Sequence, residues 1–329
     1  MIAKEPSDTI RFARDRRFTT AARAGFEHLL RQLDRGDGRR ILLPAYLGFS
    51  PLEGSGVFDP IRACATPYAL YRVRDDLSAD MEHLEELARA APALAVFAIH
   101  YFGFAQPELT RMRALCDELD IALIEDCAHC IDSRSGDQLL GDVGDYALFS
   151  LHKLLPTADG GILQVNERGE RGARDERGHH RPEIAALPDA ATISPTALQV
   201  YCNADIPAIS RRRIDHYQRL AELLAPIANV SVMWPELPAG TVPLNLPVRI
   251  AGVDRYQVYQ RMRARDFGVV ALYHTMVSAI TREQFPTSHC IADSILNLPT
   301  HQDAEPEQFS AMVRALDQAI RELSRAGAG

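Results

Sequence analysis

Lysine is almost missing from this chain. Of 36 basic residues among 329, only Lys4 and Lys153 are lysines. A GC-rich coding bias accounts for a general preference for arginine, yet one internal lysine is kept. A guanidinium stays protonated and does not form an imine under ordinary conditions, whereas an amine can. Lys153 is therefore the first residue to consider for chemistry.

Features of several other protein classes are missing too. No run of about 18 apolar residues exists, so we expect no membrane span. The first residues lack the apolar core of a signal peptide, which predicts a cytoplasmic protein. The net charge is −8 and no basic block is interleaved with aromatics, so we expect no nucleic-acid partner. The triplet Arg211–Arg213 lies in a helical pattern and is interpreted as a solvated face.

The six cysteines are too scattered to suggest a disulfide framework. Cys127 and Cys130 form a CxxC pair, but no second pair follows at the spacing of a zinc site. We interpret them as small buried thiols and expect no metal. His179 and His180 lie in the polar, Gly-rich segment 166–181, which reads as a solvated loop.

The first half of the chain alternates apolar strands with a helical pattern. The run Ala93–Ile99 is continuously apolar, as in a strand covered on both faces. An amphipathic helix is expected over Glu108–Asp120, followed by strands at Ile121–Ile124, Tyr146–Leu151 and Gly161–Val165. Strand, helix, strand at this spacing predicts an α/β fold with a mostly parallel sheet flanked by helices.

The last third changes character. Short apolar runs alternate there with longer amphipathic patterns, which predicts a smaller α+β domain. We expect a large domain over 1–204 and a small C-terminal domain over 205–329. The expected strands are Val230–Met233, Leu244–Ile250 and Val269–Leu272, and the expected helices are Asp254–Arg265 and Glu305–Leu323.

Three polar residues follow three of the predicted parallel strands. His100 follows Ala93–Ile99, Asp126 comes just after Ile121–Ile124, and Lys153 comes just after Tyr146–Leu151. Ligands in such sheets bind beyond the carboxyl ends of the strands. We therefore expect these three side chains to converge on one site.

An ordered set of motifs covers the same region. It comprises Ile124-Glu125-Asp126-Cys127-Ala128-His129, the Gly-rich turn 141–145, Phe149-Ser150, Lys153 and Asp159-Gly160-Gly161. This set resembles the DegT/StrS-type sugar aminotransferases, which have the aspartate aminotransferase fold. The resemblance implies a pyridoxal 5'-phosphate (PLP) enzyme of fold type I.

The resemblance implies a role for three of these residues. Lys153 would hold PLP as a Schiff base and carry the proton between Cα and C4′. Asp126 would keep the pyridinium nitrogen protonated, which the electron sink requires. His129 matches the position that contacts the ring hydroxyl. The plainer interpretations are a helix N-cap for Asp126 and a locally bonded, half-buried histidine for His129.

Other residues match the cofactor's phosphate and ring. Ser150 matches a phosphate-binding hydroxyl. Thr20 and Ala21 lie where the family opens a helix under the phosphate, although Thr20 alone also suits a simple N-cap. The family usually stacks an aromatic ring on the cofactor, and either Phe49 or Tyr46 could do so here.

Two residues are candidates for the substrate side. His100 would line the pocket or only fix its turn, and Glu53, in the Glu-Gly-Ser-Gly segment 53–56, would form a local substrate loop or an ordinary turn. The chain departs from the family in two places. Ser150 and Lys153 are two residues closer than usual, and the family's Gly-x-Asn-x-Arg stretch has no counterpart between 166 and 205.

We therefore expect a PLP-dependent aminotransferase of specialised metabolism. By resemblance it would take an amino group from glutamate and pass it to a keto-sugar or another small carbonyl compound. Elimination, racemisation or other Cα chemistry on an amino-acid-like substrate is the alternative, and a non-catalytic protein of the same fold is a third. A homodimer is expected because the family builds its site between subunits.

Overall fold

A computed structural model describes residues 15–34, 36–166, 184–188 and 191–326. Its main feature is a seven-stranded sheet in the order β1-β9-β8-β5-β4-β2-β3. Strands β3, β2, β4, β5 and β8 pair in parallel, which confirms the predicted α/β class. Their bounds are β1 Asp15–Thr19, β2 Arg40–Pro44, β3 Tyr68–Tyr71, β4 Ala93–Ile99, β5 Ala122–Cys127, β8 Tyr146–Ser150 and β9 Gly161–Val165.

Both faces of this sheet are covered by helices. Helices α1 (Ala22–Leu33) and α2 (Phe58–Ala63) pack against one face, and α3 (Met81–Ala90) and α4 (Leu109–Leu119) against the other. Because helices cover both faces, successive side chains of a strand must alternate between two apolar cores. In β2, Ile41 and Leu43 join the core with α1, and Leu42 joins the core with α3 and α4. The continuous apolar run in β4 has the same cause.

The other end of the sheet is antiparallel. Strand β9 runs against β8, and β1 runs against β9. β9 has the predicted bounds. A Cβ on Gly161 would lie 2.3 Å from the backbone nitrogen of Ala22, so a glycine is needed where β9 meets the start of α1.

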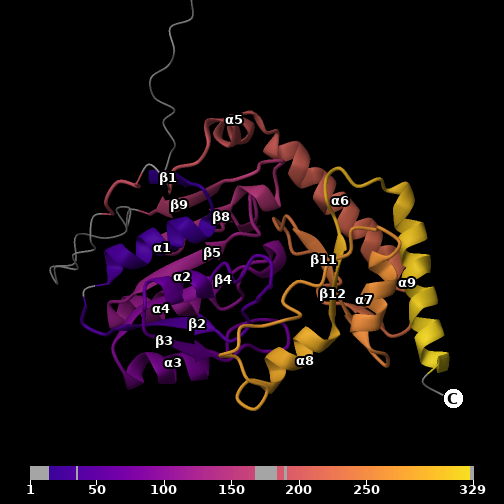
Figure 1. The fold of residues 1–329 in the computed structure, drawn as a ribbon, viewed down its shortest axis with the longest axis horizontal. Helices are drawn as coiled ribbons and strands as arrows, with labels where there is room; N and C mark the ends of the chain where they lie inside the picture. Colours follow the sequence, from indigo (N-terminus) through magenta and orange to yellow (C-terminus); the bar gives the residue numbers. More distant parts are fainter. Residues whose placement is uncertain (1–14, 35, 167–183, 189–190, 327–329) are drawn as a thin grey trace, which may run out of the picture.

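The C-terminal part forms a second layer beside the large sheet, as Figure 1 shows. Its antiparallel sheet has the order β10-β11-β12. One cluster of buried apolar side chains continues from the large sheet into this part, and the division at 204/205 stays a prediction. The bounds are β10 Val230–Val232, β11 Asn245–Ile250, β12 Ile295–Pro299, α5 Pro195–Asn203, α6 Ile206–Leu224, α7 Arg255–Arg263, α8 Pro286–Ser294 and α9 Glu307–Ala326.

A short hairpin and two 3₁₀ helices complete the fold near the large sheet. The hairpin β6 (Arg134–Ser135) and β7 (Gln138–Leu139) lies between β5 and β8, and the 3₁₀ helices η1 (Tyr101–Gly103) and η2 (Leu151–Lys153) follow β4 and β8. Each 3₁₀ turn begins where a parallel strand ends. The turns therefore lie at the edge of the sheet where ligands bind.

Two local predictions were wrong. The run Val269–Leu272 is not a strand, because only Val270 bridges to Asn297 and the chain then leaves the small sheet. The Arg211–Arg213 triplet is not entirely a solvated face either. Arg213 is fully buried in α6, where it donates from Nε to Gln302 and from Nη1 to the carbonyl of Leu244.

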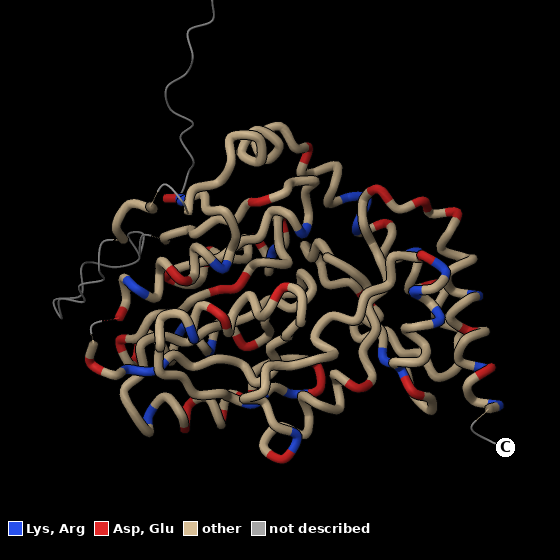
Figure 2. The backbone as a smooth tube through the Cα atoms, in the orientation of Figure 1, with Lys and Arg blue, Asp and Glu red and all other residues tan. Residues whose placement is uncertain are grey.

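Charges of both signs are interspersed along the outer helices, as Figure 2 shows. Helix α9, for example, pairs Arg321 with Asp317 at 2.9 Å, and Glu322 pairs with Arg261 of α7. Among the described residues, no helix is long and apolar enough to cross a membrane. The predicted loop over 167–181, with His179 and His180, lies outside the described residues.

Candidate active site

A cavity opens where the parallel strands end, which is where an α/β sheet binds its ligands. Three segments form its walls: the start of α1, the loop 47–57, and the strand ends with η2. Its lining includes Ala21, Arg23, Gly48, Glu53, Asp126, Ser150, His152, Lys153 and Tyr273. The predicted pair Asp126 and Lys153 therefore faces one space.

Lys153 is placed at the end of η2 by the turn that follows β8. Among the described residues, its amine has no hydrogen-bond or ion-pair partner. The side chain keeps accessible surface toward the cavity, but protein surrounds its amine closely. This desolvation lowers the pKa of Lys153, although Asp126 and Glu53 act in the opposite direction. A larger share of the amine is therefore neutral and nucleophilic near neutral pH.

Asp126 is the buried carboxyl group of the cavity. It lies within β5, at the next-to-last position, because the strand runs to Cys127 and not only to Ile124 as expected. Its Oδ1 accepts a hydrogen bond from the amide of Ala128 at 2.8 Å, and its second oxygen has no hydrogen-bond partner among the described residues. Burial raises the pKa of Asp126, and the nearby charge of Lys153 opposes that rise. The free oxygen is available to a positively charged ligand.

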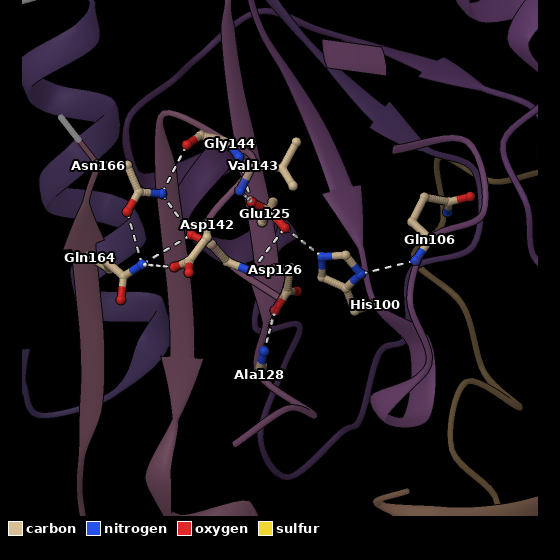
Figure 3. A network of polar contacts seen from close by, with 11 residues as sticks. His100, Gln106, Glu125, Asp126, Ala128, Asp142, Val143, Gly144, Gln164 and Asn166 are labelled. Carbon is tan, nitrogen blue, oxygen red and sulfur yellow. Dashed lines mark hydrogen bonds and ion pairs between the residues drawn. The ribbon is translucent and has the colours of Figure 1, made fainter. Parts of the chain in front are cut away.

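Glu125, the neighbour of Asp126, points into a different environment. Figure 3 shows its carboxylate between His100 and the turn 141–144. Its Oε2 lies 2.9 Å from His100 Nε2 and accepts from the amide of Gly141, and its Oε1 accepts from the amides of Val143 and Gly144. Burial opposes ionisation, but these donors outweigh it and lower the pKa of Glu125. Glu125 thus fixes the turn that precedes β8.

His100 belongs to this network and does not line the cavity. Its Nδ1 accepts from the amide of Gln106 at 3.0 Å, so its hydrogen is on Nε2, directed at Glu125. His100, Glu125 and Cys127 offer three potential metal ligands within 4.8 Å of one another. Because N–H donors occupy the Glu125 oxygens and both nitrogens of His100 are engaged, this group is explained as a hydrogen-bond network.

His129 is also buried away from the cavity lining. Its ring stacks on Phe102 at 5.9 Å, and its Nδ1 accepts from the amide of Phe102 at 3.0 Å. Burial, with the charge of Lys153, holds the pKa of His129 well below its usual range. His129 is therefore neutral, with its hydrogen on Nε2. Its predicted contact with the cofactor hydroxyl stays a prediction.

Two of the three residues predicted near the cofactor phosphate line the cavity. Ala21, Arg23 and Ser150 line the cavity, and no side chain caps the start of α1. The free N–H groups of such a helix end attract anions. Thr20 lies outside the lining, because its backbone bonds Ala191 and Gly160.

The expected stacking residues do not line the cavity. Tyr46 is fully buried, and Phe49 is 41% exposed, but neither belongs to the cavity lining. Glu53 does line the cavity, as expected for a substrate-side residue.

Among the lining residues that the sequence analysis missed, Arg23, His152 and Tyr273 have the side chains best suited to contact a ligand. Arg23 and His152 adjoin Ala21 and Lys153 in the chain, so their proximity to predicted residues was a usable signal. Tyr273 lies 120 positions beyond Lys153, and the motifs give no sign of it.

The chemistry of these groups fits the cofactor that the resemblance implies. A lysine amine without a protein partner suits an aldehyde, and a buried carboxylate with a free oxygen suits a protonated ring nitrogen. The uncapped start of α1, with Arg23 and Ser150, suits a phosphate. All of these groups border one cavity.

Comparisons with known proteins agree with this fit. Residues 25–172 match the family model of the DegT/DnrJ/EryC1/StrS aminotransferase family. The PLP form of Spr1654 from Streptococcus pneumoniae is similar in structure, with a TM-score of 0.77, 15% identity, and coverage of 94% of this chain and 87% of that one.

Two further structures share the fold. TlmJ from Streptoalloteichus hindustanus has a TM-score of 0.72 and 23% identity over 95% of this chain and 87% of its own. PseC from Helicobacter pylori has a TM-score of 0.74 and 14% identity over 93% of this chain and 87% of its own. Residues 25–172 thus match the DegT/DnrJ/EryC1/StrS aminotransferase family model, and the chain shares its fold with solved aminotransferases, in agreement with the resemblance seen in the sequence.

Proposed function

We propose that this protein is a PLP-dependent aminotransferase that passes an amino group from an amino acid, glutamate by family resemblance, to a keto-sugar or another small carbonyl compound. The observation that carries the proposal is that Lys153 and Asp126 face the same cavity. Family relatives support the reaction class: PseC is an aminotransferase involved in the biosynthesis of pseudoaminic acid, and TlmJ is an aminotransferase.

Bound PLP would supply an electron-withdrawing ring that makes the Cα proton of an amino acid removable. Lys153 has two tasks in this proposal. Its amine would hold the cofactor through the aldehyde carbon, and, when not attached to the cofactor, it would accept and return the Cα proton. The lowered pKa of Lys153 suits both tasks, because a neutral amine is the form that attacks and accepts.

Asp126 keeps the ring nitrogen protonated through its free carboxylate oxygen. The amide of Ala128 holds the other oxygen at 2.8 Å, so the group cannot rotate away without losing that bond. In a buried site this pairing is stronger than in water.

Polar groups of the cavity lining are proposed to contact the substrate. Glu53 and His152 lie there with Arg23, whose guanidinium donates to the carbonyl of Glu53 at 2.7 Å. This contact ties the loop to the start of α1. The Glu53 carboxylate lines the same cavity as Lys153, and it can accept hydrogen bonds from a hydroxyl-bearing substrate.

A homodimer and a cytoplasmic location are also proposed. Loop residues Phe49 and Leu52 are 41% and 95% exposed beside the cavity residue Glu53. Exposed apolar side chains next to a site suit a protein interface, and a twofold pair is the commonest assembly. Light scattering of the purified protein tests the dimer, and a Leu52→Asp variant should shift it toward the monomer.

The central experiment is to add PLP to purified protein and follow its visible absorption. We expect a yellow protein whose colour borohydride fixes on Lys153, as located by peptide mapping. Glutamate should then convert the spectrum to that of the amine form. A wild-type protein that stays colourless would contradict the proposal.

The short spacing between Ser150 and Lys153 departs from the family pattern, so a second reaction class is proposed as the alternative. Ser150 and Lys153 are separated by the short turn η2, and the hydroxyl of Ser150 lies 3.4 Å from His152 Nδ1. If PLP binds but glutamate never converts the spectrum, elimination or racemisation on another amino acid is favoured. Product analysis with a panel of amino acids then separates the two.

A further inference from the structure

One residue of the cavity wall comes from the C-terminal part of the chain. The other lining residues lie between 21 and 153, whereas Tyr273 follows β11 and α7. Backbone hydrogen bonds fix its segment on both sides. Leu272 donates to Oδ1 of Asn297 at 3.0 Å, and the carbonyl of Thr275 accepts from the amide of Phe49 at 2.9 Å.

The ring of Tyr273 is held from behind by other aromatic rings. It stacks on Tyr46 with centroids 5.2 Å apart and planes at 26°. Tyr101, Phe102 and His129 meet it edge-on at 5.5 to 6.0 Å. Such contacts stabilise one ring position. The buried Tyr46 thus acts as a support for Tyr273.

Two backbone features accompany this ring position. Tyr273 has φ 60°, a left-handed conformation that is costly for a bulky residue. A Cβ on Gly48, across from it, would lie 3.0 Å from Cδ1 of Tyr273. A side chain at position 48 would therefore push the ring out of place.

The hydroxyl of Tyr273 has no hydrogen-bond partner among the described residues. Burial, followed by the charge of Asp126, raises the pKa of Tyr273 well above its usual range, so the phenol is neutral. Tyr273 is therefore an uncharged aromatic ring beside a cavity that also holds Asp126.

We propose that Tyr273 is the aromatic residue that packs against the cofactor ring, and that Gly48 provides the space for it. The inference rests on the proposed function, because it requires that PLP occupies this cavity. The small C-terminal sheet would then contribute directly to cofactor binding through the segment that follows Val270.

Equilibrium dialysis of PLP against four variants tests this proposal: Tyr273→Phe, Tyr273→Ala, Gly48→Ala and the double variant Gly48→Ala/Tyr273→Ala. Loss of the ring should weaken PLP binding about tenfold, the scale of one aromatic contact. Tyr273→Phe should bind within about twofold of wild type, since the ring is kept. The visible circular dichroism of bound PLP should change in Tyr273→Ala and persist in Tyr273→Phe.

The double variant shows whether Gly48 acts through the ring. The methyl group of Gly48→Ala should weaken PLP binding when Tyr273 is present and have little effect when it is absent. If Tyr273→Ala fails to fold by far-ultraviolet circular dichroism, Tyr273→Phe and Gly48→Ala still test the proposal.

The outcomes separate the two proposals. A wild-type protein that binds no PLP would overturn the proposed function itself. Wild type and Tyr273→Ala that bind PLP equally, with the same dichroism, would overturn the role of Tyr273 alone. Equal losses from Gly48→Ala in both backgrounds would also overturn it.

Discussion

Gln302 donates its side-chain amide to the carbonyl oxygen of Leu154 at 3.1 Å, next to Lys153 in the chain. The other end of the amide is fixed, because its oxygen accepts from Nε of the buried Arg213 at 2.9 Å. The C-terminal part thus holds the turn that carries Lys153. Burial lowers the pKa of Arg213 to about 10, and its Nη2 has no partner among the described residues.

Replacing Gln302 should destabilise the protein. Gln302→Leu removes both hydrogen bonds and leaves a further N–H of Arg213 unpaired in the interior, which costs about 1–3 kcal/mol. Urea denaturation at neutral pH measures the free energy of unfolding. Gln308→Leu, at an exposed position of α9, is the matched control and should change it little. An unchanged midpoint for Gln302→Leu would contradict the bridging role.

Lys153→Arg should abolish covalent capture of PLP. A guanidinium keeps the positive charge but cannot attach the aldehyde. Borohydride treatment followed by peptide mapping checks this. Lys4→Arg changes the other lysine of the chain and should label as wild type does. Label found elsewhere in Lys153→Arg would refute the assignment.

Asp126→Asn should bind PLP but react slowly. The substitution keeps an oxygen for the amide of Ala128 while it removes the charge at the ring nitrogen. Loss of a buried electrostatic partner lowers turnover on the order of 10²-fold or more. Stopped-flow conversion of the cofactor spectrum by an amino donor measures it. The exposed Asp137→Asn variant serves as control.

Capture of PLP should increase with pH through the lowered pKa of Lys153. Desolvation lowers this pKa, and the negative charge of Asp126 raises it in part. Removal of that charge in Asp126→Asn should therefore shift the midpoint to lower pH. Rates of PLP attachment measured across pH in both proteins test the sign. A midpoint that moves upward would show that Asp126 does not act on the amine.

Glu125 should stabilise the fold in a pH-dependent manner. Its hydrogen bonds outweigh burial and lower its pKa in the folded state. Its contribution is therefore present above the unfolded pKa of about 4.3 and is lost as pH falls through the lower folded value. Glu125→Gln should lose about 1–3 kcal/mol near neutral pH, because an NH₂ group then faces N–H donors. The free energy of unfolding of Glu125→Gln should also fall less steeply than that of wild type as the pH is lowered, which denaturation curves recorded at decreasing pH measure.

Much of the fold could be predicted because its signals are local. Strands β4 and β9 have the predicted bounds, and Lys153 and Asp126 share a cavity because parallel strands end at one edge. These features depend on apolar runs and on sheet geometry. Apolar runs and sheet geometry can both be inferred without knowing which distant parts of the chain are in contact.

The remaining site residues depend on tertiary packing. His100 lies at a strand end as expected, but Glu125 and Gln106 hold it inside the network. Tyr273 reaches the cavity only because its segment leaves the small sheet at Val270, where a strand was expected. Arg213 is buried although two arginines precede it, since helical position and not residue type decides its direction.

The adjacent acids of β5 face opposite sides of one strand, as successive residues must. Glu125 secures the turn before β8, and Asp126 serves the cavity. A one-residue insertion or deletion before this pair would exchange their surroundings, sending the longer acid toward the ligand and leaving the turn without its anchor. Evolution can therefore vary many side chains around this strand, but it has little freedom to change the strand's length.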